Sequence, residues 1–212
     1  MSSDLKKIAI IGLGLIGSSI LHAIRMKSPK SIKTYAYDNS AKVRKIVKKM
    51  KISDQVCGHL KEAVEDVDLI ILAIPVGSMG QVIKNLVKYV KKGSIITDTG
   101  STKVSVIRDI KPFISNDISF IPTHPLAGTE HSGPESGFPS LFEDRYWIII
   151  GKENDKKALI LKNLFETFGA VVEFMDETYH DKIMAMTSHL PHLIAFTIVS
   201  TANQLEKDIK ND

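Results

Sequence analysis

The chain has 212 residues, of which 43% are hydrophobic and 25% are charged, as in globular proteins and unlike disordered ones. Its net charge of +4 comes from lysines that are scattered among acidic residues, so the composition does not predict a nucleic-acid partner. A positive balance of this kind favours anionic small molecules over cationic ones.

The first half of the chain alternates short apolar runs with segments of helical spacing. The predicted strands are 8–11, 32–37, 69–74, 94–97 and 118–121, and the predicted helices are 15–26, 41–49, 79–90 and 103–114. This alternation is typical of βαβ units and predicts a doubly wound, mostly parallel sheet in an α/β fold. The run 69–74 is apolar at every position, as expected of a strand that is covered on both faces.

The stretch 123–145 interrupts this pattern. It has three prolines, three glycines and two histidines without a sustained period, which predicts a long and therefore functional loop. A strand at 147–150, a helix at 156–168 and a strand at 171–175 follow, and only helical patterning continues from about 178 to 206. We therefore predict one α/β domain over 1–176 and the beginning of an all-helical domain over 177–212.

The first predicted strand runs into a glycine-rich segment, Gly12–Gly17, that opens the first predicted helix. In this glycine turn, Gly12 permits the tight turn, Gly14 lets the backbone approach a pyrophosphate, and Gly17 lets helix and strand pack closely. The helix N-terminus attracts the phosphate charge. A strand and a helix in these places predict a Rossmann-type dinucleotide-binding domain. The candidate cofactor-binding residues here and after the later strands are Gly12, Gly14, Leu15, Ile16, Gly17, Pro75 and Ser101.

Asp38 ends the second predicted strand, 21 residues after Gly17. A carboxylate at this position hydrogen-bonds the ribose hydroxyls of the adenosine and repels the 2′-phosphate of NADP, which favours NAD as the cofactor. Lys42 and Arg44 follow closely, and their positive charges leave NADP as an alternative cofactor. In the alternative interpretation, these are turn glycines and a helix-capping aspartate that bind no cofactor.

Three further segments carry polar side chains that are typical of a reaction site. They are 98–103 (Asp-Thr-Gly-Ser-Thr-Lys), 124–133 (His-Pro-Leu-Ala-Gly-Thr-Glu-His-Ser-Gly) and the pair 180–181 (His-Asp) with 188–192 (Ser-His-Leu-Pro-His). Ser101 and His124 each follow a predicted strand, so we expect both at the carboxyl edge of the sheet, where a nicotinamide would lie. An imidazole there can accept the proton of a substrate hydroxyl as hydride leaves the same carbon. Ser101 could orient that imidazole or cap a helix, and His124 could instead be a structural loop residue.

The last predicted helix carries a polar stripe on an otherwise apolar surface. At about 100° per residue, Asp181, Ser188 and His192 lie within ~20° of one face, and His189 lies on the same side. This spacing favours a lined substrate cleft over a solvated face with incidental histidines. Pro191 must leave a backbone carbonyl without its helical partner beside these histidines.

These motifs together resemble those of the prephenate dehydrogenase family, which includes arogenate and cyclohexadienyl dehydrogenases. The glycine turn, the D-x-G-S-x-K turn, the H-P-(I/L)-A-G-T-E loop and the H-D…S-H-L-P-H helix occur in this order between residues 8 and 192. The resemblance implies NAD-dependent oxidative decarboxylation of prephenate or arogenate in tyrosine biosynthesis. It implies that His124 is the catalytic acceptor for the ring hydroxyl and that Ser101 is its partner near the nicotinamide. The implied substrate-binding residues are Glu130, His180, Asp181, His189 and His192.

One departure from the family concerns arginine. The family's helical domain continues further and supplies an arginine for a substrate carboxylate, whereas Arg25, Arg44, Arg108 and Arg145 all precede the last predicted helix. We therefore expect weak substrate affinity. Two alternatives stay open: a truncated NAD-binding relative without full activity, and a β-hydroxyacid-type dehydrogenase with a catalytic lysine such as Lys182.

The remaining features bear on location and assembly. No apolar run approaches the ~20 residues that cross a bilayer, the N-terminus leaves no room for a signal peptide, and Cys57 is alone. We therefore expect a cytoplasmic protein with no metal, membrane or nucleic-acid partner. The helix over about 178–206 is apolar on more than one side and must be covered, which predicts a homodimer.

Overall fold

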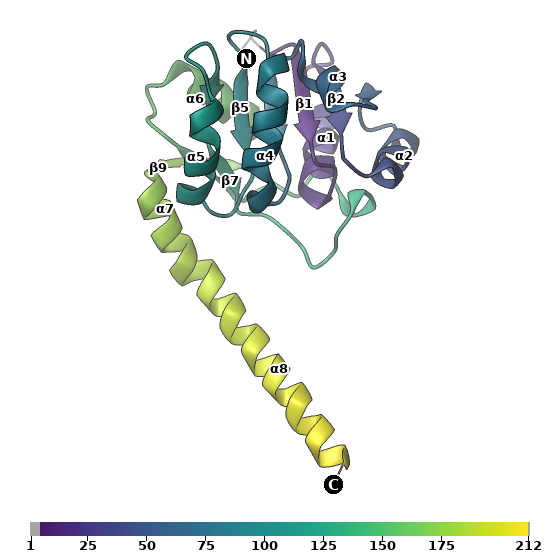
Figure 1. Ribbon diagram of the computed structural model, residues 1–212, viewed down its shortest axis with the longest axis vertical. Helices are drawn as coiled ribbons and strands as arrows, with labels where there is room; N and C mark the ends of the chain where they lie inside the picture. The colour runs from purple at the N-terminus through teal and green to yellow at the C-terminus, as the bar shows by residue number, and fades with distance from the viewer. Residues whose placement is uncertain (1–4, 212) are drawn as a thin grey trace.

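The computed structural model describes residues 5–211, with side chains up to Glu206, as an α/β body from which one long helix extends (Figure 1). Within these residues the main sheet has six strands in the order β3-β2-β1-β4-β5-β6. The strands are β1 (Lys7–Ile11), β2 (Lys33–Tyr37), β3 (Gln55–Val56), β4 (Leu69–Leu72), β5 (Ile95–Asp98) and β6 (Ser119–Phe120). The connecting helices are α1 (Leu15–Lys27), α2 (Ala41–Met50), α3 (Leu60–Val64), α4 (Val76–Leu86) and α5 (Val104–Ile110).

Every pair of neighbouring strands in this sheet is parallel, which confirms the predicted doubly wound, Rossmann-type fold. The strand order reverses between β1 and β4, so the ends of these strands form the crevice where such sheets bind ligands. The elements β3 and α3 were not predicted. Two and five residues are too few to carry a hydrophobic period.

A second sheet follows, in the order β7-β8-β9 over the described residues. It consists of β7 (Thr123–Pro125), β8 (Tyr146–Ile150) and β9 (Val171–Met175), with α6 (Lys156–Thr167) between the last two. The prediction of a loop over 123–145 is wrong at its first three residues, because β7 pairs antiparallel with β8. A three-residue edge strand that ends in proline gives no alternating pattern. His124 therefore lies on a strand, opposite Ile148.

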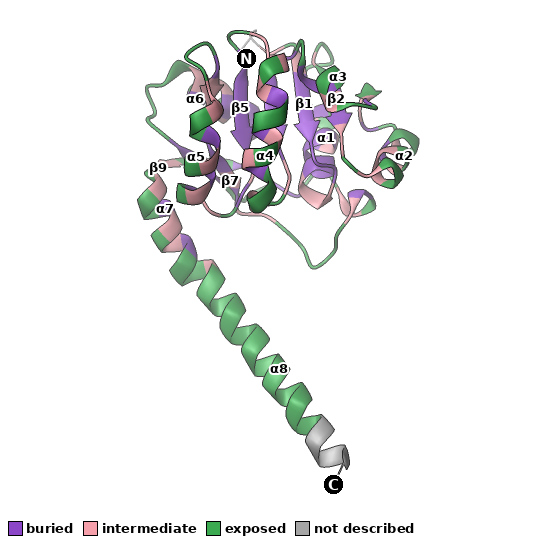
Figure 2. Ribbon diagram, in the orientation of Figure 1, coloured by how far each residue is buried: buried purple, intermediate pink, exposed green. Residues whose placement is uncertain are grey.

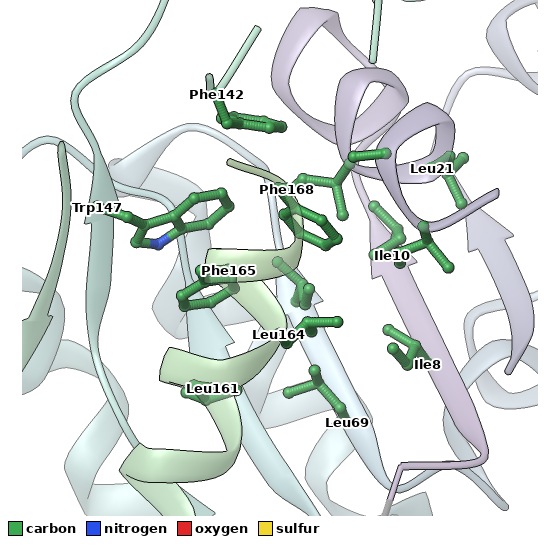
Figure 3. Close-up of a cluster of buried hydrophobic side chains, with 14 of the residues drawn as sticks. Ile8, Ile10, Leu21, Leu69, Phe142, Trp147, Leu161, Leu164, Phe165 and Phe168 are labelled. Carbon is green, nitrogen blue, oxygen red and sulfur yellow. The ribbon is translucent and has the colours of Figure 1, made fainter. Parts of the chain in front are cut away.

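The described apolar side chains form one cluster on each face of the main sheet. Leu69 and Ile71 of β4 belong to one cluster and Ile70 and Leu72 to the other, as predicted for a strand that is covered on both sides. Figure 3 shows the first cluster, in which α6 packs against β1 and β4. There the Trp147 ring stacks on Phe165 with 3.9 Å between centroids, so the second sheet shares the core of the first.

The predicted final helix extends away from the body. It consists of α7 (Glu177–Met184), a π-helical turn (Ala185–His189) and α8 (Leu190–Asn211). The described side chains of α8 are all exposed (Figure 2). The large apolar side chains that are exposed along this helix are Met186, Leu190, Leu193, Ile194, Phe196, Ile198, Val199 and Leu205.

By length and composition this helix could also cross a membrane. Among the described residues, the helix over Glu177–Glu206 has a mean hydropathy of 1.4 over an 18-residue window, of which 6% is buried. The sequence expectation differs because it counted uninterrupted apolar runs, which polar residues such as Thr187, Ser188 and His189 break, whereas the mean is taken over a whole window. One helix of this kind is weak evidence for a membrane segment, since the core helix of a soluble protein and an N-terminal signal sequence pass the same test.

Candidate active site

The glycine turn lies between the end of β1 and the start of α1. Gly12 has a φ of +96°, and a Cβ there would lie 2.3 Å from the Ala73 carbonyl oxygen. A Cβ at Gly17 would lie 1.9 Å from the Gly12 carbonyl oxygen, whereas nothing lies within 4 Å of a Cβ built at Gly14. Gly14 is also the N-cap of α1 and has no side chain to occupy the first N–H groups of the helix. The packing requires Gly12 and Gly17, while Gly14 borders open space beside a helix N-terminus, which fits a dinucleotide phosphate.

Asp38 is held against the glycine turn. Its Oδ2 accepts a hydrogen bond from the Leu13 N–H at 2.9 Å, and its Oδ1 accepts one from the Ser40 N–H at 2.8 Å. The N-cap of α2 is Ser40, so the alternative of a helix-capping Asp38 is wrong. Arg44 donates to the Asp38 carbonyl oxygen at 2.6 Å and lies over the Tyr37 ring. The Arg44 guanidinium is therefore engaged by backbone and ring.

The other candidate cofactor-binding residues lie at the same edge of the sheet. Leu15 and Ile16 are half-buried at the start of α1, Pro75 is the N-cap of α4 beyond β4, and Ser101 is exposed beyond β5. Since β1, β4 and β5 are parallel, their carboxyl ends bring these segments to one edge. The alternative of Ser101 as a helix cap is wrong, because α5 begins at Val104.

A buried ion pair connects the end of β5 to the starts of α5 and β7. The Lys103 ammonium contacts the Asp98 carboxylate and donates to the Thr123 carbonyl oxygen at 2.6 Å. Asp98 also accepts the N–H groups of Gly100 and Thr123, and both charged side chains are 0% exposed. Burial raises the pKa of Asp98 and lowers the pKa of Lys103, and their mutual attraction opposes both shifts. Because His124 follows Thr123, this pair fixes the strand that carries it.

The pair was not assigned a role from the sequence, although both residues stand in the segment 98–103. The motif D-x-G-S-x-K placed them five positions apart, and the only signal was a lysine and an aspartate at the two ends of a strand-to-helix turn. A charge at the end of a strand is usually solvated, so burial could be seen only in the folded chain.

His124, His180 and Asp181 form a line of hydrogen bonds, which we call the histidine relay. His124 Nδ1 lies 2.9 Å from His180 Nε2, and His180 Nδ1 lies 2.8 Å from Asp181 Oδ1. The Asp181 carboxylate also accepts the N–H groups of Lys103 at 2.7 Å and Val104 at 3.0 Å. The structure thus brings together three of the predicted site residues and attaches α7 to the start of α5.

The environment of the relay keeps its imidazoles uncharged. Burial lowers the pKa of His124 to about 3, and the charges of Lys103, His180 and His189 act in the same direction while Asp181 opposes them. Burial also lowers the pKa of His180. Burial disfavours the Asp181 carboxylate, but the N–H groups that it accepts hold its pKa below the usual value. The site therefore combines two neutral imidazoles with one carboxylate.

Three predicted substrate-binding residues lie outside this line of hydrogen bonds. His189 and His192 are exposed on the π turn and α8, and Glu130 is exposed in the loop after β7, 3.3 Å from His131. The π turn takes more residues than an α-helical turn, so the spacing of about 100° per residue does not hold across it. The prediction that Asp181 and His192 share one face assumed this uniform spacing and stays a prediction.

Comparisons with known proteins show which family the chain belongs to. Residues 21–174 match the family description "Prephenate dehydrogenase, nucleotide-binding domain", and residues 176–212 match "Prephenate dehydrogenase, dimerization domain". The chain belongs to the prephenate dehydrogenase family. This confirms the resemblance that the sequence motifs indicated.

Individual relatives show how much of a family member is present. The chain is 39% identical to the cyclohexadienyl dehydrogenase of Zymomonas mobilis, over 95% of its own length and 69% of the relative. It is 34% identical to the prephenate dehydrogenase of Lactococcus lactis, over 96% of its length and 56% of the relative. The crystal structure of prephenate dehydrogenase from A. aeolicus with hydroxyphenyl propionate and NAD+ matches with 30% identity and a TM-score of 0.85, over 95% of this chain and 70% of that one. The chain therefore spans between 56% and 70% of these relatives.

In this family member, Lys103→Met removes one partner of the buried pair and leaves the Asp98 carboxylate unpaired. We expect the free energy of unfolding, measured by urea titration, to fall by about 3–5 kcal/mol. Lys92→Met is the matched control, because the Lys92 side chain is 85% exposed and faces Asp117 at 3.0 Å. It should change the free energy by less than about 1 kcal/mol. Equal effects of the two substitutions would contradict a structural role for the buried pair.

Proposed function

We propose that this chain binds NAD and takes part in the oxidative decarboxylation of prephenate or arogenate. The observation that carries the proposal is a neutral, half-buried His124 beside the carboxyl edge of the main sheet, held by a carboxylate-anchored relay. Membership of the prephenate dehydrogenase family supports it, as does the relative that was solved with NAD+ and hydroxyphenyl propionate.

His124 acts in the proposed reaction as the proton acceptor. The ring hydroxyl of the substrate donates a hydrogen bond to the imidazole, which takes the proton as the carbon–oxygen double bond forms. Bound NAD supplies the hydride acceptor, and loss of the ring carboxylate as CO2 returns its bonding electron pair through the ring to the oxygen, which takes the proton back from the imidazolium as the phenol forms. A charged imidazole could not accept this proton, and burial keeps the His124 ring neutral by lowering its pKa. Ser101, exposed beyond β5, is proposed to hydrogen-bond near the nicotinamide.

The glycine turn and Asp38 are proposed to hold the cofactor. The N–H groups at the start of α1 suit the pyrophosphate, and the open space beside Gly14 admits it. The Asp38 carboxylate suits the ribose hydroxyls of NAD, and the Arg44 guanidinium already contacts the Asp38 carbonyl oxygen and the Tyr37 ring.

The two alternatives fare differently. A β-hydroxyacid-type dehydrogenase has no support, because Lys182 is exposed and the chain belongs to another family. An NAD-binding relative without full activity is favoured by one observation, the exposure of His189 and His192 on the extended helix. Covering that helix would bring other side chains to the substrate.

We propose that a second copy of the chain covers the helix. The residues 176–212 match the dimerization domain of the family, and the exposed apolar side chains of α8 lie within that match. A cytoplasmic homodimer that binds no metal and no nucleic acid remains our prediction.

Cofactor choice is tested first by titrating NADH and NADPH, followed by fluorescence. NADH should have a lower Kd than NADPH, and Asp38→Ala should reduce the ratio of the two Kd values. Gly14→Ala should fold normally but weaken NADH binding by on the order of tenfold, because a methyl group displaces a charge-assisted hydrogen bond. Gly17→Ala should fail to fold, because its Cβ would overlap the Gly12 carbonyl. NADPH binding equal to or tighter than NADH binding would contradict the assignment.

The role of His124 is tested by His124→Asn in steady-state assays with prephenate and with arogenate. The value of kcat should fall by on the order of 10²–10⁴-fold, the usual contribution of general acid–base catalysis, while NADH binding stays unchanged. Ser101→Ala should lower kcat by less. His131→Asn is the matched control, because His131 is 70% exposed in the following loop, and it should leave kcat unchanged. An unaltered kcat in His124→Asn rules out the assignment.

Assembly is tested by light scattering over a concentration series. The chain should be a dimer at micromolar concentration, and Phe196→Asp should produce monomers, because a charge in an apolar interface loses its hydration. Met26→Asp is the control, since Met26 is also exposed, at 68%, but lies on α1 and not on the final helix. The proposal fails if the unchanged chain is a monodisperse monomer whose final helix is folded by hydrogen exchange.

A further inference from the structure

The hydrogen bond between His180 and Asp181 determines which nitrogen of His180 carries the hydrogen. The Asp181 carboxylate accepts the Lys103 and Val104 N–H groups, and these bonds favour its charged form. A charged carboxylate only accepts hydrogen bonds. At 2.8 Å from Asp181 Oδ1, His180 Nδ1 must therefore carry the hydrogen and donate it.

The other nitrogen of the His180 ring, Nε2, faces His124. The ring is 0% exposed, and burial favours its neutral form. A neutral imidazole that carries its hydrogen on Nδ1 has a lone pair on Nε2. His180 Nε2 is thus an acceptor, and His124 Nδ1, at 2.9 Å, must be the donor.

The same hydrogen bond determines the state of the second His124 nitrogen, Nε2. With its hydrogen on Nδ1, the neutral His124 ring has a lone pair on Nε2. The other tautomer would present an N–H at Nε2 and could not take a proton from a hydroxyl. We infer that His180 and Asp181 are positioning residues that fix the tautomer of His124 and thereby make its Nε2 the proton acceptor. The inference rests on the proposed function only for the identity of the proton that Nε2 takes.

The relay also connects the two predicted domains. His124 lies on β7, whereas His180 and Asp181 lie on α7, beyond the predicted boundary near residue 176. Asp181 is attached to the first N–H groups of α5, so α7 must pack there for the chain of hydrogen bonds to be complete. The acceptor state of His124 therefore depends on the correct docking of the helical domain.

Nitrogen-15 NMR of the histidine-labelled whole chain tests the tautomer without any substrate. The His124 resonances are identified by their loss in His124→Asn. We expect Nδ1 protonated and Nε2 unprotonated from pH 8 down to pH 5.5, where a free imidazole is mostly charged. The groups that act on this titration are Lys103, His180, His189 and Asp181. A wild-type His124 with its hydrogen on Nε2 overturns the inference.

The substitution Asp181→Ala tests what fixes the tautomer. Asp181 Oδ1 accepts both the Lys103 N–H and the His180 Nδ1–H, so an asparagine oxygen in its place would keep both bonds, whereas alanine removes the acceptor. Without an acceptor, nothing fixes the hydrogen of His180 on Nδ1. We expect NMR to show mixed tautomers of His124 and kcat to fall by on the order of tenfold or more, with KM for prephenate and NADH binding little changed. A His124 that keeps its hydrogen on Nδ1 alone in a folded Asp181→Ala chain contradicts the inference.

Two substitutions of one residue, His180→Gln and His180→Leu, test the same inference if Asp181→Ala does not fold. The glutamine oxygen can accept from His124 Nδ1–H and should hold the tautomer and most of kcat, whereas leucine should lose both. Equal kcat values for the two variants would indicate a structural role only and overturn the inference. The NMR and kinetic results are separable: the expected tautomer without turnover contradicts the proposed function alone, and turnover with hydrogen on Nε2 contradicts the relay alone.

Discussion

The buried contact between Lys103 and Asp98 is the constraint on which the arrangement of the site depends. Two charges lie where both side chains are 0% exposed, and removing either would leave the other unpaired without water. Because Thr123 bonds to both members of the pair, the end of β5 and the starts of α5 and β7 must meet at one point. The Thr123 hydroxyl also accepts from Trp147 Nε1, so the aromatic core fixes the same strand. His124 follows directly and has little freedom.

The sequence predicted the elements that carry a long hydrophobic period. The fully apolar β4 and the helices α1, α2 and α6 lie within a few residues of their predicted bounds, because their side chains repeat over whole turns or a doubly covered strand. The strand β7 was missed, since a short strand with polar residues and a proline resembles a loop. The requirement for glycine at positions 12 and 17 was also predictable, because it arises from backbone sterics within one turn.

The contacts that assemble the site could not be predicted in the same way. His124 and His180 are 56 positions apart, and Asp181 is 77 positions from Val104, so no local pattern joins them. Histidines and carboxylates in motifs indicated a reaction site, but the hydrogen bonds that give each ring its role depend on the packing of α7 against α5. The predicted polar stripe on the last helix assumed a single helical period, which the π turn interrupts.

We propose that the buried pair and the relay together present a neutral imidazole that takes the hydroxyl proton during oxidative decarboxylation. The most direct test follows NADH by absorbance and CO2 by a label in the ring carboxylate of prephenate, in one reaction with the unchanged chain. The account predicts that NADH and CO2 appear together in equal amounts, with arogenate as the second substrate if prephenate gives neither. NADH binding without formation of either product from both substrates would contradict it.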